Sequence, residues 1–421
     1  MKTRRDFLKL AGAAGLAVMG PLSFTKRARA ANEPWLGTFF VTVHAGGGWD
    51  PTSLCDPKGR ANEETDDPMN MYFTGDIGEI GNLSYAPVGN NQWFFERHYQ
   101  NLLVLNGVDT QTNSHDAGTR NTWCGQLTEG HPAFSAVVAA ALGPDRPMAF
   151  VTNGGYDVTQ GEVAATRIGN TGVFQRIAEP HRVDPLYNER EYHLPSTQAR
   201  IKKFQAERLA TMADRQHLPH VRKSINSLQL ARRSDNELQR LTEALPESLD
   251  DSNNPLRRQA QLAMAAAKAG LAISANLAVG GFDTHGNHDA NHIPRLERLL
   301  DGVDFLWQEA ERQGIADRLV VMVGSDFGRT PGYNDTNGKD HWSITSVMLM
   351  GQGIKGNRVI GQTDERHGPM TVNPQSLVMD GAGIRIQPNH IHRALRKLAK
   401  IEDSDVAQRY FVPGEDLPLL G

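Results

Sequence analysis

Five side chains able to bind a metal ion or transfer a proton lie within ten positions of the segment GFDTHGNHDANH. They are Asp283, His285, His288, Asp289 and His292. Carboxylate and imidazole ligands without a thiolate suit Zn²⁺, Mn²⁺, iron or Ca²⁺ rather than a cysteine-type structural zinc site. The residue types therefore predict a site for a divalent metal, with Zn²⁺ as the expected ion.

The five side chains are not expected to share one role. Asp283 and His285 directly follow an apolar segment that reads as a strand, and we expect them to be ligands. His288 competes with His285, because the loop can turn either imidazole inward. Asp289 and His292 lie close to a helix expected to begin near Pro294, where capping or a solvated first turn is their expected role.

Polar clusters follow other expected strands in the same way. One runs from His44 to Asp50, Asp326 follows RLVVMVGS, and Asp340 and His341 lie in GKDHW. In open α/β sheets, ligands bind at the carboxyl ends of the strands, so these clusters can converge on one centre. Two metal ions about 4 Å apart can hold the attacking and leaving oxygens of an ester displacement.

Arg329 lies in SDFGRTP, three positions after Asp326. Its fork of N–H donors would suit a phosphate or sulfate group. A surface salt bridge is the alternative role.

Other chemistry has less support, since the sequence contains no G-x-S-x-G elbow, no phosphate-binding G-x-x-x-x-G-K-[ST] loop and no H-E-x-x-H motif.

Apolar runs typical of buried strands alternate along the chain with segments of helical spacing. The expected strands lie within 35–50, 101–109, 146–155, 271–281, 317–330 and 342–353, and the expected helices within 131–143, 256–270, 293–314 and 388–401. This alternation predicts an α/β fold with a mainly parallel central sheet flanked by helices. Residues 31–421 are expected to form one domain, with a polar helical insertion at about 197–247.

Composition excludes several classes of protein. The 421 residues are 39% hydrophobic and 22% charged, with a net charge of −4 and no long basic tract, so nucleic acid is not an expected partner. The two cysteines, Cys55 and Cys124, are too few for a disulfide framework. They form either one bridge in an oxidising compartment or two separate core thiols.

The first 30 residues are typical of a twin-arginine export signal. TRRDFLK is followed by a weakly apolar, Gly/Ala-rich run and by ARA at Ala28 to Ala30. The run is short for a membrane span of about 20 residues. We expect the twin-arginine (Tat) translocase to export the protein to the periplasm, with cleavage after Ala30 and no stable membrane span in the mature chain.

The segments GGFDTHGNH, GSDFGRTP, GKDHW and GQGIKGNRVIGQTDE occur in this order and resemble the DUF1501 family. That family is placed in the alkaline phosphatase–sulfatase superfamily, whose fold is a mainly parallel sheet between helices. The resemblance implies metal ligands on loops at strand ends. It assigns that role to Asp50, to Asp283 with His285 or His288, to Asp326 and to His341.

The sequence departs from the superfamily pattern at two places. Many members have Asp-His where this chain has Asp326 and Phe327, so the site is expected to hold one metal ion or an altered pair. The region that usually carries the nucleophile reads NSHDAGTRNTWCGQLTEGHP. Its hydroxyl groups belong to Ser114 and Thr119, whereas His115 is a ligand, a base or a phosphoryl acceptor.

Two functions follow from this pattern. The first is a periplasmic, metal-dependent hydrolase of small anionic phosphate or sulfate esters. The second is a non-catalytic member of the same fold, which binds a metal or an anion or takes part in envelope assembly. The missing imidazole and the uncertain nucleophile favour the second function, but the motifs of the scaffold that the chain resembles make the hydrolase the expected function.

Overall fold

A computed structural model describes residues 33–169, 181–183, 190–218, 221–222, 224–225 and 235–421. The chain divides into two compact units, Met1–Glu33 and Pro34–Gly421, and the strands and helices named below belong to the second. The expected export signal, residues 1–30, lies outside the described residues. No described helix combines the length and the apolar character needed to cross a membrane.

An eight-stranded sheet forms the centre of the unit Pro34–Gly421, with strand order β12-β4-β11-β8-β1-β7-β5-β6. β11 runs antiparallel to both its neighbours, and the other pairs of adjacent strands are parallel. The eight strands are β1 (Phe39–Gly46), β4 (Leu102–Asp109), β5 (Phe150–Thr152), β6 (Ala165–Arg167), β7 (Ser274–Gly280), β8 (Leu319–Ser325), β11 (Ile344–Gly351) and β12 (Arg358–Ile360). The predicted mainly parallel α/β sheet is confirmed.

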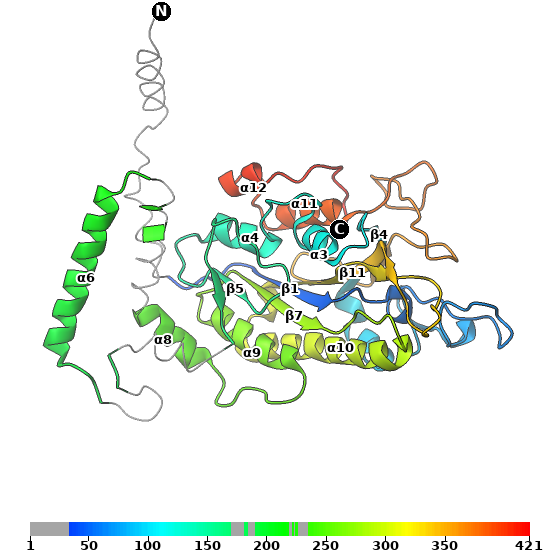
Figure 1. Cartoon of the computed structure of the whole chain (residues 1–421), viewed down its shortest axis with the longest axis horizontal. Coiled ribbons are helices and arrows are strands. Elements are labelled where there is room, and N and C mark those ends of the chain that lie inside the picture. Colours follow the sequence, from blue (N-terminus) through cyan, green and yellow to red (C-terminus); the bar gives the residue numbers. More distant parts are fainter. Residues whose placement is uncertain (1–32, 170–180, 184–189, 219–220, 223, 226–234) are drawn as a thin grey trace, which may run out of the picture. The chain divides into compact units, whose positions relative to one another are not determined.

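Helices cover both faces of this sheet (Figure 1). Alternating residues of β1 belong to opposite cores, as Val41 packs with residues of α9 and α10 and Phe40 packs with residues of α4 and α11. The helices are α2 (Asn91–His98), α3 (His115–Cys124), α4 (Phe134–Leu142), α6 (Pro195–Arg215), α8 (Asp235–Ala244), α9 (Pro255–Lys268), α10 (His288–Gln313), α11 (Pro388–Leu398) and α12 (Asp405–Arg409). Strands buried on both faces explain the nearly continuous apolar runs in the sequence.

Two small antiparallel sheets complete the fold, β2 (Gly78–Ile80) with β3 (Leu83–Tyr85) and β9 (Gly328–Arg329) with β10 (His341–Trp342). The second of these matters for the site, because it pairs His341 with Arg329 just beyond the carboxyl end of β8.

Two sequence expectations need correction or refinement. α10 begins at His288 and contains Pro294, so the helix starts earlier than expected and the proline lies within it. Within the expected helical insertion, the described helices are α6 and α8, and residues 219–220, 223 and 226–234 lie outside the described residues. The question left open for the cysteines is answered, since Cys55 and Cys124 are both free and buried.

Candidate metal centre

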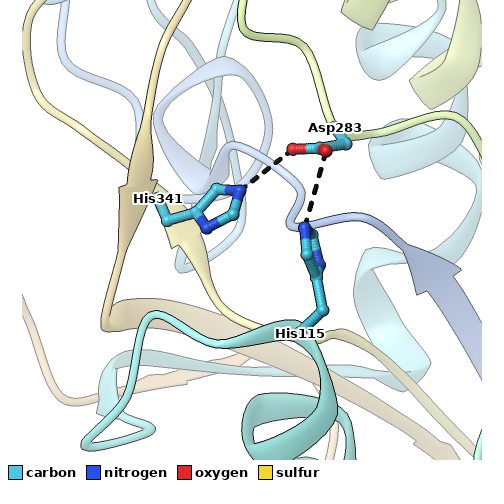
Figure 2. A group of neighbouring side chains, drawn as sticks. All are labelled: His115, Asp283 and His341. Carbon is cyan, nitrogen blue, oxygen red and sulfur yellow. Dashed lines mark hydrogen bonds and ion pairs between the residues drawn. The ribbon is translucent and has the colours of Figure 1, made fainter.

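Three side chains from distant parts of the sequence meet beyond the carboxyl end of the sheet (Figure 2). Asp283 lies in the loop after β7, His115 is the first residue of α3, and His341 is the first residue of β10. The Asp283 carboxylate lies 3.0 Å from Nε2 of His341 and 3.5 Å from Nε2 of His115. Among the described residues, this is the group of metal-capable side chains whose ligand atoms all lie within 4.8 Å of one another.

His285 approaches the same carboxylate oxygen as His341. Its Nε2 lies 3.0 Å from Asp283 Oδ1 and 3.0 Å from Nε2 of His341. The ligand atoms of a tetrahedral zinc ion lie about 3.4 Å apart when each bond is about 2.1 Å long. The spacing of these side chains therefore fits a zinc-sized ion.

The imidazoles of His115, His285 and His341 each have a hydrogen-bond acceptor within 2.8 Å of Nδ1. Asp326 Oδ2 lies 2.7 Å from Nδ1 of His115, Asp340 Oδ1 lies 2.7 Å from Nδ1 of His285, and the carbonyl oxygen of Asn113 lies 2.8 Å from Nδ1 of His341. An acceptor at Nδ1 places the proton of a neutral imidazole there and leaves a lone pair on Nε2.

This tautomer gives the group its chemical character. With the protons on Nδ1, the three Nε2 lone pairs and the Asp283 carboxylate are all electron-pair donors pointing at one another. Such an arrangement is repulsive unless a proton or a cation lies among them. A ligand histidine whose other nitrogen donates to a carboxylate or a carbonyl is also the usual pattern around protein metal ions.

Asp283 is held by Arg329 as well as by the histidines. Partial burial disfavours the ionised carboxyl group, but the hydrogen bond from Arg329, at 2.7 Å, and the contacts with His341 and His285 together outweigh it and lower the pKa of Asp283 to about 2. Asp283 is therefore ionised, as a metal ligand must be.

The position of Arg329 differs from both roles expected for it. Its side chain is completely buried and donates to the carbonyl oxygens of Gly47, Gly48 and Lys339 as well as to Asp283. It is therefore not a surface salt bridge. Its N–H donors are directed at protein acceptors rather than at a site for a substrate anion.

Asp50 and His288, expected to be ligands, lie instead in a separate buried cluster. Oδ2 of Asp50 accepts a hydrogen bond from Nζ of Lys339 at 2.6 Å and lies 3.1 Å from Nε2 of His288. The backbone N–H of Asp50 donates to Nε2 of His292 at 2.9 Å, and the hydroxyl of Thr284 lies 2.7 Å from Nδ1 of His288. This buried cluster joins the three loops that carry Asp50, Asp283 and His341.

The charges in the buried cluster follow from its contacts. Burial disfavours ionisation of Asp50, but the adjacent charge of Lys339 and the contact with His288 hold the pKa of Asp50 well below its ordinary value. Burial also lowers the pKa of His292 well below its ordinary value, so this ring is neutral. The expectation of a solvated role for His292 is wrong, because the side chain is fully buried.

Asp326 lies behind the metal centre rather than within the three-residue group. Its Oδ2 accepts hydrogen bonds from His115 and from the backbone N–H of Gly47, and its Oδ1 lies 3.1 Å from Nε2 of His44. Burial opposes ionisation, yet the contacts with His44 and His115 hold the pKa of Asp326 below its ordinary value. Sequence reasoning included His44 in a polar cluster but assigned it no role.

Phe327 lies at the position where the family resemblance led us to expect an imidazole. Its ring centroid lies 4.9 Å from that of His115 and 4.4 Å from that of His341. An apolar ring thus packs against two of the candidate ligands. The two hydroxyl groups expected near the nucleophile position, those of Ser114 and Thr119, have no hydrogen bond to the metal-centre side chains in the described part of the chain.

Comparisons with known proteins give the following similarities. A structure of Ps i-CgsB in complex with k-i-k-neocarrahexaose has a TM-score of 0.42 at 8% identity, over 90% of this chain and 75% of that chain. The PsFucS1 sulfatase from Pseudoalteromonas sp. has a TM-score of 0.38 at 8% identity, over 90% and 73%. Alkaline phosphatase from the Antarctic bacterium TAB5 has a TM-score of 0.37 at 10% identity, over 88% and 99%.

These scores are all below 0.5, so the functional argument rests on the residues of this chain. No curated protein sequence matches it. The family model described as "Protein of unknown function (DUF1501)" matches residues 39–378, which include the metal centre and the central sheet. The chain therefore belongs to the DUF1501 family.

Proposed function

We propose that the chain is an exported, metal-dependent hydrolase of phosphate or sulfate esters. The observation that carries this proposal is the convergence of His115 and His341 on the Asp283 carboxylate, with each imidazole held in the tautomer that a metal ion requires. A divalent ion held there supplies a Lewis acid for the ester oxygen and lowers the pKa of water. Zn²⁺ is the expected ion.

Three protein ligands leave a coordination position open, which is typical of catalytic rather than structural zinc sites. In this proposal the ligands are His115, Asp283 and His341. His285 is then the residue that moves a proton at the open position, because its side chain is half-exposed and its Nδ1 contacts Asp340. The hydrogen bond with His285 lowers the pKa of Asp340, so an ionised carboxylate supports this imidazole.

A second function, non-catalytic metal or anion binding, has its own support. If His285 is a fourth ligand, then the coordination shell is closed, as in structural zinc sites. The N–H groups of Arg329 donate to protein acceptors, and neither Ser114 nor Thr119 is hydrogen-bonded to the metal-centre side chains among the described residues. The two functions therefore differ in whether His285 transfers a proton or is a fourth metal ligand.

His285→Gln tests this difference directly. The hydrolase proposal expects one bound ion per chain and turnover of an aryl phosphate, phosphodiester or aryl sulfate. His285→Gln would then lower kcat by about 10²–10⁴-fold, as expected for loss of an acid–base group, and leave zinc affinity nearly unchanged. His193→Gln, at an exposed histidine, is the matched control.

The binding function expects the opposite pattern. His285→Gln would lower zinc affinity by about 10–100-fold, and no ester would be turned over by the metal-loaded wild-type protein. Bound metal without any turnover across the three classes of ester would overturn the hydrolase proposal and support the second function.

The proposed location rests on the twin-arginine sequence near the N-terminus. Replacement of Arg4 and Arg5 by lysine keeps the charge but changes the motif that the Tat translocase reads. We expect the Arg4→Lys/Arg5→Lys variant to remain in the cytoplasm at its precursor length. Unchanged recovery from the periplasm would contradict Tat export.

A further inference from the structure

A line of buried polar contacts runs from the interior to His115. The indole N–H of Trp123 donates to Nδ1 of His44 at 2.6 Å, and Nε2 of His44 lies 3.1 Å from Asp326 Oδ1. The other oxygen of Asp326 accepts from Nδ1 of His115 at 2.7 Å. Trp123, His44 and Asp326 are each less than a tenth exposed, so water does not compete for these contacts.

Each contact in this line fixes the next one. An indole nitrogen only donates, so Nδ1 of His44 must be the acceptor, and the proton of the neutral ring lies on Nε2. Nε2 of His44 lies 3.1 Å from Asp326 Oδ1, an oxygen with no hydrogen bond of good geometry among the described residues, so the contact is electrostatic and disfavours a second donor at Oδ1. Asp326 Oδ2 already receives the N–H groups of Gly47 and His115. Oδ2 therefore accepts two hydrogen bonds, and Oδ1 has the close contact with Nε2 of His44.

We propose that Trp123 and His44 are positioning residues that keep Asp326 as an acceptor and thereby hold His115 with its Nε2 lone pair toward Asp283. Asp326 then acts through His115 and is not itself a metal ligand. This inference rests on the metal centre of the proposed function, but it requires no ester turnover.

The same geometry makes a specific prediction for an amide in place of the carboxylate. In Asp326→Asn, the amide oxygen can keep the two donors at the Oδ2 position. Its NH₂ group then faces the N–H of His44, and Trp123 prevents His44 from moving its proton to Nδ1. Two donors would face each other in a buried space, so the amide should also adopt the flipped orientation, which turns its NH₂ group toward Nδ1 of His115 and moves the proton of that ring to Nε2.

Removal of the indole N–H should relieve this conflict. In Trp123→Phe, Nδ1 of His44 is no longer held as an acceptor, so the ring can carry its proton there and accept from the amide at Nε2. The loss caused by Asp326→Asn should therefore be smaller in the Trp123→Phe background than in the wild-type background. If the two substitutions instead weakened zinc binding independently, through separate damage to the structure, their losses of binding free energy would add.

The experiment measures the zinc dissociation constant of four proteins: wild type, Trp123→Phe, Asp326→Asn and the double variant. We expect about a 10-fold weakening for Trp123→Phe and up to about 100-fold for Asp326→Asn, the range typical of residues that orient metal ligands. The double variant should bind zinc more tightly than Asp326→Asn alone. Trp307→Phe is the matched control, because the buried indole nitrogen of Trp307 has no hydrogen-bond partner among the described residues.

Histidine ¹⁵N NMR of the metal-free proteins at neutral pH gives a second readout. It should show the His115 proton on Nδ1 in the wild type and in Trp307→Phe, and a mixture of tautomers in Asp326→Asn. Additive losses of affinity, or an unchanged His115 tautomer in Asp326→Asn, would overturn the inference. A wild type with the expected tautomer and zinc affinity but no turnover would overturn only the proposed hydrolase.

Discussion

Nε2 of His285 lies 3.0 Å from Nε2 of His341, while both rings direct their Nδ1 atoms at acceptors in Asp340 and Asn113. Neutral rings bonded in this way have no proton between the two Nε2 atoms. Their lone pairs face each other and the ionised Asp283. A cation held by Asp283 and His341 reduces this repulsion, and it can bind only if the loops that carry these side chains stay close together.

Gly338 sets the distance between the His285 loop and the strand that carries His341. A Cβ at this position would overlap the backbone carbonyl oxygen of His285, and backbone cannot move aside as a flexible side chain can. Gly338→Ala should therefore separate the two loops and weaken zinc binding about 10-fold or more, with a loss of roughly 1–3 kcal/mol in the free energy of unfolding.

Isothermal titration with Zn²⁺ and urea unfolding measure these two effects. Gly381→Ala is the matched control, because a Cβ at Gly381 meets no atom within 4 Å and its backbone is not left-handed. Equal zinc affinity in Gly338→Ala and Gly381→Ala would show that the close approach of these loops does not matter for binding.

The buried ion pair of Lys339 and Asp50 should stabilise the loops of the metal centre. Lys339→Met leaves the Asp50 carboxylate buried without its cation, and a loss of about 3–5 kcal/mol in the free energy of unfolding is expected. Asp50→Asn should cost a similar amount. The double variant should lose less than the sum of the two single losses, because neither charge is then left alone.

Urea unfolding of the four proteins forms a double-mutant cycle. Strict additivity of the two losses would mean that Lys339 and Asp50 do not stabilise each other. Zinc affinity should fall in both single variants, since Lys339 is followed directly by Asp340 and His341.

His392 should contribute to acid sensitivity. Burial lowers its pKa from 6.5 to about 4, while its Nε2 lies 2.8 Å from the carbonyl oxygen of Thr122. Between these two pKa values the unfolded chain binds more protons than the folded chain, so stability falls as the pH drops from about 6.5 to 4. The full loss is about 3 kcal/mol, from about 1.4 kcal/mol for each pKa unit.

His392→Gln keeps a neutral N–H donor for the Thr122 carbonyl and removes the titrating ring. The free energy of unfolding of this variant should fall less steeply between pH 6.5 and pH 4 than that of the wild type, by up to about 3 kcal/mol over the interval. Parallel curves for the two proteins would contradict this role of His392.

Apolar runs allowed the strands to be predicted, because a strand buried on both faces has little need of polar residues. FFVTVHAG and LVVMVGS are such runs, and they form β1 and β8 at the middle of the sheet. The start of α10 was harder to predict. Pro294 suggested a first turn, whereas the helix begins at His288 and accommodates the proline inside.

The residue types of the candidate site could be predicted from the sequence, but not which of these residues lie together in the folded chain. Asp283 could be recognised because it follows a strand, and His341 because it lies in the GKDHW segment of the family resemblance; both lie at the metal centre. Asp50 also follows a strand, yet it lies in the buried cluster because Lys339 and His288 compensate its charge there. Sequence alone does not show which lysine reaches a given carboxylate.

His44 illustrates the same limit. A histidine in a buried strand has no distinctive spacing, and its role depends on Trp123 and Asp326, which are far away in the sequence. The odd polar residue in an otherwise apolar strand was the signal available for it.

The central claim is that His115, Asp283 and His341 form a metal site, and zinc titration of the chelator-treated protein tests it most directly. The wild type should bind one Zn²⁺ per chain, and Asp283→Ala should lose this binding while Glu297→Ala, at an exposed residue of α10, keeps it. Absence of stoichiometric zinc binding in the wild type, or equal affinity in Asp283→Ala, would contradict the claim.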